Sequence, residues 1–354
     1  MAFGGGTLTQ AAILLAVRVA VLDDYHRIAN TLADWSSLDV EVAFFDRSLT
    51  REQLPAVLAG FDTLVLMRER TAFPRELLEQ LPDLELVITT GMRNASLDIE
   101  YLRARGVRVC GTGIPGYGSR EKPGSGNQSA AAGAPTAPPR GLPSTIELAW
   151  ALIFALFKRV PHEDRAVRAG VWQAGLPRNL AGATLGLLGL GRLGAQMVAP
   201  ARAFGMEVIA WSQNLTPERA AEVGALAVTR DELLTRSDVL SIHLVLSERT
   251  RGLIGVEELG QMQPGAFLVN TSRGPIVDQR ALVDALRSQR IAGAGLDVYD
   301  VEPLPADSEL LGLENTVLTP HLGYVSREGL AEMYEQVVED LAAYLRGEPI
   351  RVIA

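Results

Sequence analysis

Short runs of apolar residues alternate with amphipathic stretches over the first hundred residues of the chain. The apolar runs have the length of β-strands, and the segments between them, such as 51–58 and 74–81, have helical spacing. Strands that alternate with helices typically form a parallel sheet covered by helices on its faces. The strands predicted here are Val17–Leu22, Val40–Phe45, Thr63–Met67, Leu86–Thr89 and Val107–Cys110.

A second alternation of the same kind fills residues 184–319 and predicts a second α/β domain. The chain then closes with an amphipathic helix that runs from about Leu330 to Leu345 and is stopped by Gly347 and Pro349. The strands predicted in this part are Thr184–Leu188, Glu207–Trp211, Val239–Leu244, Ala266–Asn270, Ala294–Val298 and Thr316–Leu318.

The two alternations are separated by residues 115–143, which lack any apolar period. Twenty of these 29 positions are Gly, Pro, Ala or Ser, so little offsets the entropy of ordering the backbone. We predict a disordered insertion, and a tolerated linker is favoured over a lid or partner-binding arm because long surface loops cost little to close. Ser144 and Glu147 match a capping box, which predicts that a helix starts there. This helix is apolar almost all round, so a domain junction or a subunit interface is expected to bury it.

Length and composition agree with two folded domains and exclude several classes of protein. The chain has 354 residues, which is long enough for two domains that each bury a hydrophobic core. Its hydrophobic fraction of 47% is far above that of an intrinsically disordered chain. A single cysteine rules out a disulfide scaffold and suits a reducing cytoplasm. The net charge of −9 argues against nucleic acid or an anionic membrane as partner. The apolar stretch Ala11–Leu22 is too short to span a bilayer and lacks the features of a signal peptide, so a cytoplasmic location is predicted.

A glycine triplet carries the strongest local signal. Gly189, Gly191 and Gly194 follow a predicted strand and precede a predicted helix, which is the context of a dinucleotide-binding turn. The first glycine permits the tight turn, the second lets the backbone approach a pyrophosphate, and the third allows close packing of helix on strand. The acidic residue that usually ends the next strand is absent, since Ser212 stands there, and Arg219 lies within reach of a 2′-phosphate. This departure weakens the case for a strict NAD preference, so NAD is expected as the cofactor and NADP is left open.

Three reactive side chains follow predicted strands in the second half of the chain. Arg273, Glu302 and His321 come just after strand ends, where α/β sheets bind ligands. Arg273 has the donors to clamp a carboxylate and polarise an adjacent carbonyl. His321 can give a proton to the carbonyl oxygen, with Glu302 fixing the tautomer of its imidazole. Each residue alone is more often structural, but together behind a dinucleotide turn they favour the reduction of a small anionic 2-keto acid. No cluster of His, Cys and Asp has metal-site spacing, so no metal is predicted.

The same segments give the chain a resemblance to a known family. The stretches GLGRLGAQ, NTSRGPIVD, GAGLDVYDVEPLP and LTPHLGY are similar to the signature regions of the D-isomer-specific 2-hydroxyacid dehydrogenases. The resemblance implies two Rossmann-like domains of doubly wound parallel sheet, with the cofactor domain inserted into the catalytic domain. The catalytic domain would comprise residues 17–143 and 325–354, and the dinucleotide-binding domain residues 144–324.

The resemblance also implies roles for individual residues and a homodimer built around the cofactor domains. Arg273, Glu302 and His321 would take the catalytic roles given above. The cofactor contacts it implies, besides the three glycines, are Arg192, Leu193, Ser212, Leu244, Thr250, Thr271 and Asp297, with Asp297 at the nicotinamide amide. The substrate loop would be Met92, Arg93 and Asn94, while Arg68 and Arg70 are as consistent with a solvated surface as with the cleft. Because some proteins of this fold are nucleotide-sensing co-repressors, a binding protein is the alternative to an enzyme.

Overall fold

The computed structural model describes residues 17–113 and 143–354, which form two compact units. The first unit comprises the described residues up to 113 together with Arg327–Ala354, and the second comprises residues 143–326. The insertion predicted at 115–143 lies outside the described residues, apart from Pro143 at its end.

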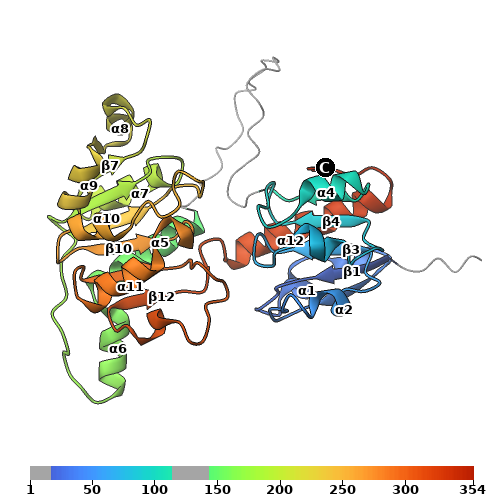
Figure 1. The fold of residues 1–354 in the computed structure, drawn as a ribbon, viewed down its shortest axis with the longest axis horizontal. Coiled ribbons are helices and arrows are strands. Elements are labelled where there is room, and N and C mark those ends of the chain that lie inside the picture. The colour runs from blue at the N-terminus through green and yellow to red at the C-terminus, as the bar shows by residue number, and fades with distance from the viewer. Residues whose placement is uncertain (1–16, 114–142) are drawn as a thin grey trace, which may run out of the picture. The chain divides into compact units, whose positions relative to one another are not determined.

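The first unit is a parallel sheet of five strands in the order β2-β1-β3-β4-β5 (Figure 1). This order places β1 and β3 side by side at the point where the direction of winding reverses, and crevices at such points are where open α/β sheets bind ligands. Its elements are β1 (Val17–Val21), α1 (Ala29–Leu32), β2 (Val40–Phe44), α2 (Leu54–Val57), β3 (Thr63–Leu66), α3 (Arg75–Leu78), β4 (Leu86–Thr89), α4 (Ile99–Ala104), β5 (Arg108–Gly111) and α12 (Arg327–Leu345).

The second unit is a parallel sheet of seven strands in the order β12-β11-β10-β9-β6-β7-β8. The reversal falls between β6 and β9, so the loops after these strands flank the ligand crevice. Its elements are α5 (Ser144–Phe157), α6 (Val160–Arg168), β6 (Thr184–Leu188), α7 (Gly194–Ala203), β7 (Glu207–Trp211), α8 (Pro217–Val223), β8 (Leu226–Ala227), α9 (Arg230–Arg236), β9 (Val239–Ile242), α10 (Val256–Gln261), β10 (Phe267–Asn270), α11 (Gln279–Arg287), β11 (Gly293–Leu296) and β12 (Thr316–Leu318).

All the strands predicted from the apolar runs are confirmed to within two residues at either end, but two details differ. The edge strand β8 was not predicted, because it has only two residues and no apolar period. The predicted capping box at Ser144 is wrong: Pro143 occupies the cap position, and its carbonyl oxygen accepts hydrogen bonds from the N–H groups of Ile146 and Glu147. Ser144 is therefore already inside the helix, where its hydroxyl cannot serve as the cap.

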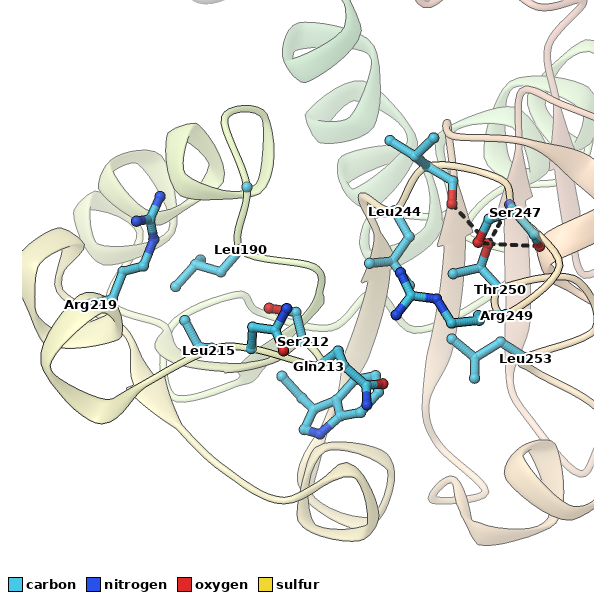
Figure 2. A pocket seen from close by; sticks show the side chains of 14 residues that line it. Leu190, Ser212, Gln213, Leu215, Arg219, Leu244, Ser247, Arg249, Thr250 and Leu253 are labelled. Atoms are coloured by element: carbon cyan, nitrogen blue, oxygen red, sulfur yellow. Dashed lines mark hydrogen bonds between the residues drawn. The ribbon is translucent and has the colours of Figure 1, made fainter. Parts of the chain in front are cut away.

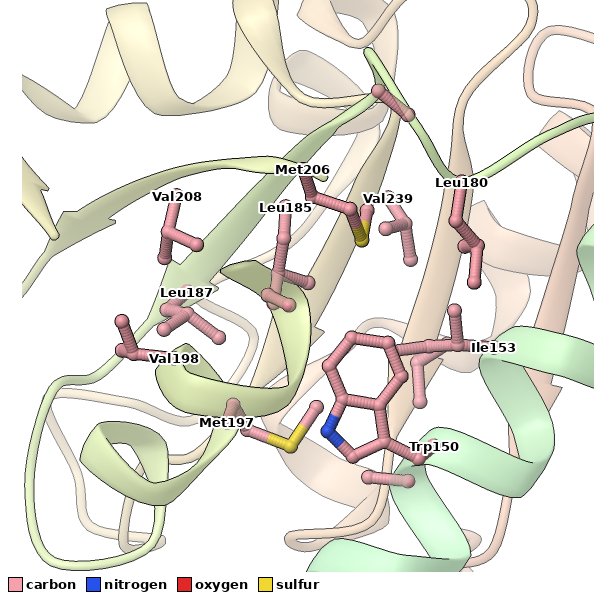
Figure 3. Close-up of a cluster of buried hydrophobic side chains, with 14 of the residues drawn as sticks. Trp150, Ile153, Leu180, Leu185, Leu187, Met197, Val198, Met206, Val208 and Val239 are labelled. Atoms are coloured by element: carbon pink, nitrogen blue, oxygen red, sulfur yellow. The ribbon is translucent and has the colours of Figure 1, made fainter. Parts of the chain in front are cut away.

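The apolar helix α5 is buried within the core of the second unit. Trp150 and Ile153 from this helix lie among side chains of β6 and α7 in that core (Figure 3). Gly295 in β11 has no side chain to hold the helix away, and a Cβ there would come within 3.0 Å of Leu152. The burial expected from its sequence is confirmed, but the core of the second unit supplies it, whereas a domain junction or a subunit interface was predicted. None of the helices described is long and apolar enough to cross a membrane.

The C-terminal residues pair with the edge strand β5 of the first unit through backbone hydrogen bonds and with α12 through an ion pair. Arg351 donates to Asp340 Oδ1 over 2.9 Å, and the N–H of Ile353 bonds to the oxygen of Val109 in β5. Asp340 is fully buried, and its Oδ2 has no hydrogen-bond partner among the described residues. Burial therefore raises the pKa of Asp340 to about 6, although the charge of Arg351 opposes the shift.

This carboxyl group predicts a pH-dependent contribution to stability that Asp340→Asn removes. Its pKa is raised in the folded state, so the folded protein binds more protons than the unfolded chain between about pH 4 and 6. The free energy of unfolding of the wild type should thus fall, relative to the variant, by about 2 kcal/mol as pH rises through this window. Urea unfolding of both proteins at pH 4 and pH 7 measures the difference. Parallel pH dependences of the two proteins would contradict the assignment.

Candidate active site

The glycine turn between β6 and α7 has the geometry expected of a dinucleotide-binding loop. Gly189 has a φ of 104°, and a Cβ there would lie 2.7 Å from the carbonyl oxygen of His243. A Cβ on Gly194 would overlap the carbonyl oxygen of Gly189, so the helix can start only with glycine at this position. At Gly191, in contrast, a Cβ would meet nothing within 4 Å, which leaves the backbone open to a ligand. Arg192 and Leu193 complete the turn, and Leu193 is the cap residue of α7.

A cavity of about 610 Å³ opens beside this turn (Figure 2). Four of the residues predicted to contact the cofactor line it, namely Gly191, Ser212, Leu244 and Thr250. They come from the loops after β6, β7 and β9, so the strand order brings them together from distant parts of the sequence. The other lining residues are Leu190, Trp211, Gln213, Asn214, Leu215, Arg219, Val245, Ser247, Arg249 and Leu253. Of these ten residues only Arg219 was singled out from the sequence as a candidate contact; Arg249 was missed although Leu244 and Thr250 of the same loop were predicted, because no signal marks its own position.

The described residues fit a dinucleotide. The open backbone at Gly191 would take a pyrophosphate, and the apolar side chains of Leu190, Leu215 and Leu244 would hold a flat base. Thr271, also predicted as a cofactor contact, has a buried hydroxyl without a hydrogen-bond partner among the described residues. A buried polar group of this kind is normally satisfied by a partner, and a bound ligand would provide one.

His321 and Glu302 form a close pair in the second unit. Nδ1 of His321 lies 2.5 Å from Glu302 Oε2, and the second carboxylate oxygen accepts the N–H of Tyr299 over 2.9 Å. Because an ionised carboxylate only accepts hydrogen bonds, Nδ1 carries the proton and Nε2 is left for a substrate. Burial raises the pKa of Glu302, but the hydrogen bond and charge of His321, with smaller contributions from Tyr299 N–H and Arg273, outweigh it. The pKa of Glu302 thus lies below its ordinary value, and the carboxylate stays ionised at neutral pH.

Arg273 is held near this pair by a compact turn after β10. The side chain of Asn270 pins the turn, donating to the oxygen of Arg273 over 2.9 Å and accepting the N–H of Ser272 over 3.0 Å. A Cβ on Gly274 would overlap the backbone of Tyr299, so glycine lets the two loops touch. The positive charge of Arg273 also helps to lower the pKa of Glu302. The structure therefore brings together the three side chains that the sequence singled out.

Asp297 is fully buried and holds the segment that carries His321. Its carboxylate accepts hydrogen bonds from Thr319 Oγ1 at 2.7 Å and from the N–H groups of Leu322 at 2.7 Å and Gly323 at 2.9 Å. His321 itself has a φ of 54°, an uncommon conformation for a non-glycine residue that its surroundings must enforce. The contact with the nicotinamide amide implied by the resemblance stays a prediction, while these bonds give Asp297 a direct role in shaping the loop.

We expect Asp297→Asn to destabilise this loop. The amide presents an NH₂ group to at least one of the three donors, and a buried donor without an acceptor costs about 2 kcal/mol. For a unit of this size the midpoint of thermal unfolding should fall by about 5 °C. Calorimetry of the variant measures the shift, and Asp307→Asn, a change at an exposed carboxylate in the same region, is the matched control. Equal midpoints for the two variants would contradict the structural role.

The predicted substrate loop lies in the first unit, directly after β4. Met92 and Arg93 are exposed, whereas Asn94 is buried. The Asn94 amide donates to the oxygen of Arg68 over 2.7 Å and accepts the N–H of Ser96, so it shapes the loop. The side chain of Arg70 donates to the backbone oxygen of Asp23 over 2.9 Å. Contact of this loop with a substrate stays a prediction.

Two further titratable side chains, those of His243 and Cys110, have shifted pKa values. His243 lies under the glycine turn with Nε2 at 2.9 Å from Ser241 Oγ, and burial lowers its pKa to about 4. Burial also raises the pKa of the Cys110 thiol to about 11, so Cys110 is poorly reactive at neutral pH. Within residues 17–113 and 143–354, no group of three His, Cys, Asp or Glu side chains could hold a metal ion.

Comparisons with known proteins agree with this geometry. Residues 150–323 match the family model described as D-isomer specific 2-hydroxyacid dehydrogenase, NAD binding domain. The chain is 37% identical over 279 residues to a glyoxylate reductase of Korarchaeum cryptofilum, covering 77% of this chain and 76% of the relative. It is 29% identical over 347 residues to a hydroxypyruvate reductase of Blautia hydrogenotrophica, and the match covers 95% of this chain and 99% of the relative. Among solved structures, a phosphoglycerate oxidoreductase from Vibrio cholerae has a TM-score of 0.82 at 30% identity, covering 94% and 99% of the two chains.

These similarities extend over both units and include the segments that carry Arg273, Glu302 and His321. The chain belongs to the D-isomer-specific 2-hydroxyacid dehydrogenase family.

Proposed function

We propose that this dehydrogenase reduces small 2-keto acids, with glyoxylate and hydroxypyruvate as candidate substrates, and that Arg273, Glu302 and His321 carry the reaction. This proposal rests on the pair formed by Glu302 and His321, in which Oε2 of Glu302 lies 2.5 Å from Nδ1 of His321, with the charge of Arg273 nearby. The names of the relatives point to the same substrates, which are reduced by the archaeal and bacterial enzymes compared above.

NAD is the cofactor, and its reduced form, NADH, would supply the hydride that reduces the carbonyl carbon. Arg273 holds the substrate carboxylate through its planar fork of donors and polarises the neighbouring carbonyl. His321 gives a proton from Nε2 to the carbonyl oxygen, which completes the hydroxyl group of the product. Glu302 keeps a proton on Nδ1 and stabilises the imidazolium form of His321, in which Nε2 also carries the proton that is given to the substrate.

The two units would have different roles in the reaction. The second unit would bind the dinucleotide and hold the catalytic side chains, while Met92, Arg93 and Asn94 of the first unit would contact the substrate. Residues 17–143 with 325–354 would then be the substrate domain, and residues 144–324 the cofactor domain. A purely regulatory, nucleotide-sensing role is not favoured, because the relatives are enzymes.

A panel of 2-keto acids tests the function. The purified protein should oxidise NADH when glyoxylate or hydroxypyruvate is added. In the reverse direction it should reduce NAD with the corresponding 2-hydroxy acid, and for a chiral acid only with the D enantiomer. Following the loss of NADH absorbance gives kcat and KM for each acid. Binding of NADH without turnover of any member of a broad panel would contradict the proposal.

A homodimer built on the second unit is also proposed, and exposed apolar side chains support it. Trp172 is 80% exposed and Leu176 93% exposed, and Val160, Val167 and Val171 next to them are more than half exposed. Large apolar side chains gathered in this way typically mark an interface. Light scattering should therefore give twice the chain mass, and a Trp172→Glu, Leu176→Glu double variant should give the mass of one chain. A monomeric wild type at micromolar concentration would contradict the proposal.

A further inference from the structure

Tyr299 lies where the segments that carry Arg273, Glu302 and His321 meet. It comes three residues after the end of β11 and three residues before Glu302, and only 6% of its surface is exposed. The turn that carries Arg273 packs on its backbone, because Gly274 has no side chain to keep the two loops apart. Its hydroxyl reaches the segment that leads to His321. The reaction proposed above makes no use of this side chain.

The hydroxyl of Tyr299 bridges the ends of two neighbouring strands. Its oxygen lies 2.9 Å from the carbonyl oxygen of Thr319 and 3.1 Å from that of Leu296. Leu296 is the last residue of β11, and Thr319 directly follows β12. Burial, together with the charges of Asp297 and Glu302, raises the pKa of Tyr299 above its ordinary value. The hydroxyl therefore keeps its proton and acts as the donor in this bridge.

The backbone of the same residue holds the carboxylate of Glu302. The N–H of Tyr299 donates to Oε1 of Glu302 over 2.9 Å, which leaves Oε2 to accept the proton on Nδ1 of His321. Thr319 lies two residues before His321, whose φ of 54° must be enforced by its surroundings. One residue thus holds the carboxylate through its N–H and the segment of the imidazole through its hydroxyl.

We propose that Tyr299 is a positioning residue for the proton transfer, holding Glu302 and His321 at bonding distance so that the imidazole stays aligned with the carbonyl oxygen of the substrate. The inference rests on the proposed function in that His321 is the proton donor. Tyr299 does not line the cavity beside the glycine turn, so its effect on the reaction passes through the pair. Proton transfer is sensitive to such alignment, because a misplacement of about 1 Å can cost a factor of about 10² in rate.

Tyr299→Phe isolates the hydroxyl, because phenylalanine keeps the ring, the N–H to Glu302 and the backbone contact with the turn of Arg273. We expect kcat for hydroxypyruvate to fall about tenfold, while KM stays within about twofold. The ratio of kcat in H₂O to kcat in D₂O should rise, since a misaligned acid makes proton transfer more rate-limiting. Tyr344→Phe is the control, because it removes a hydroxyl that bonds to Glu85 in the first unit, and it should keep the wild-type values.

The Nδ1 proton of His321 reports the alignment without catalysis. In protein labelled with ¹⁵N-histidine, its NMR signal is identified by its absence from His321→Ala. Its exchange with water measures how often the bond to Glu302 opens, because a proton held in a hydrogen bond exchanges only when that bond breaks. We expect exchange about tenfold faster in Tyr299→Phe than in the wild type or in Tyr344→Phe.

Unchanged kcat, isotope effect and exchange in Tyr299→Phe would overturn the positioning role, even if the wild type reduces hydroxypyruvate. A lower midpoint of thermal unfolding with these three quantities unaltered would overturn it as well, since Tyr299 would then only stabilise the fold. A wild type that reduces no 2-keto acid, although the Nδ1 proton exchanges faster in Tyr299→Phe, would overturn the proposed function and support the hold of Tyr299 on the pair. The two failures are therefore distinguishable.

Discussion

Replacing His321 with alanine should lower kcat for 2-keto acid reduction by about a thousandfold, because the variant has no side chain to protonate the carbonyl oxygen. A positioned general acid contributes a factor of about 10² to 10⁴ to the rate, and the short bond to Glu302 fixes this one in place. The dissociation constant for NADH should stay within about threefold of the wild type, since the cavity beside the glycine turn contains no atom of His321. Steady-state kinetics and fluorescence titration measure the two quantities.

His26→Ala is the matched control for this change. His26 is an exposed histidine of the first unit, and its removal should leave both kcat and the affinity for NADH unaltered. If His321→Ala kept more than about a tenth of the wild-type kcat, another group would have to supply the proton. The assignment of the Glu302–His321 pair would then be wrong.

Arg273→Lys should reduce kcat/KM for the keto acid by about a hundredfold while preserving the charge. Lysine offers one ammonium group in place of the planar fork, so it cannot hold a carboxylate through two parallel hydrogen bonds. The larger part of the loss should come from KM, because the clamp acts on the bound substrate as well as on the transition state. Steady-state kinetics with hydroxypyruvate at saturating NADH gives both constants.

Arg280→Lys provides the comparison, since Arg280 is an exposed arginine on α11, seven residues further along the chain. It should leave kcat/KM unchanged. Equal effects of the two substitutions would show that charge alone matters at position 273, which would contradict a bidentate clamp.

Much of the fold follows from the sequence because the parallel strands are buried on both faces. Strands such as Thr63–Leu66 and Val239–Ile242 are buried throughout and have one polar residue each, so their positions stand out against the amphipathic helices. The position of helix α5 was equally clear from the sequence. Its burial in the core of the second unit explains why nearly all faces of this helix carry apolar residues. The two-residue strand β8 has no such pattern and depends on pairing with β7, which a single sequence does not display.

The candidate site was predictable wherever a side chain follows a strand. Arg273, Glu302 and His321 were found in this way, and the order of β10, β11 and β12 in the sheet brings the loops that carry them together. Arg249 was missed because it lies in a loop whose path is set by neighbouring elements rather than by a motif. The hydrogen bonds between Asp297 and the segment around His321 could not be predicted from the sequence either. They depend on how the loop after β12 folds back onto the end of β11.

A single-turnover experiment with NADH deuterated at C4 of the nicotinamide tests the central claim most directly. Hydroxypyruvate is mixed with excess enzyme and the labelled cofactor, and the product is analysed by mass spectrometry and chiral chromatography. The account predicts D-glycerate with deuterium at C2 from the wild type and from His26→Ala, and no labelled product on the same timescale from His321→Ala. Labelled product of L configuration, or equal labelling by His321→Ala, would contradict it.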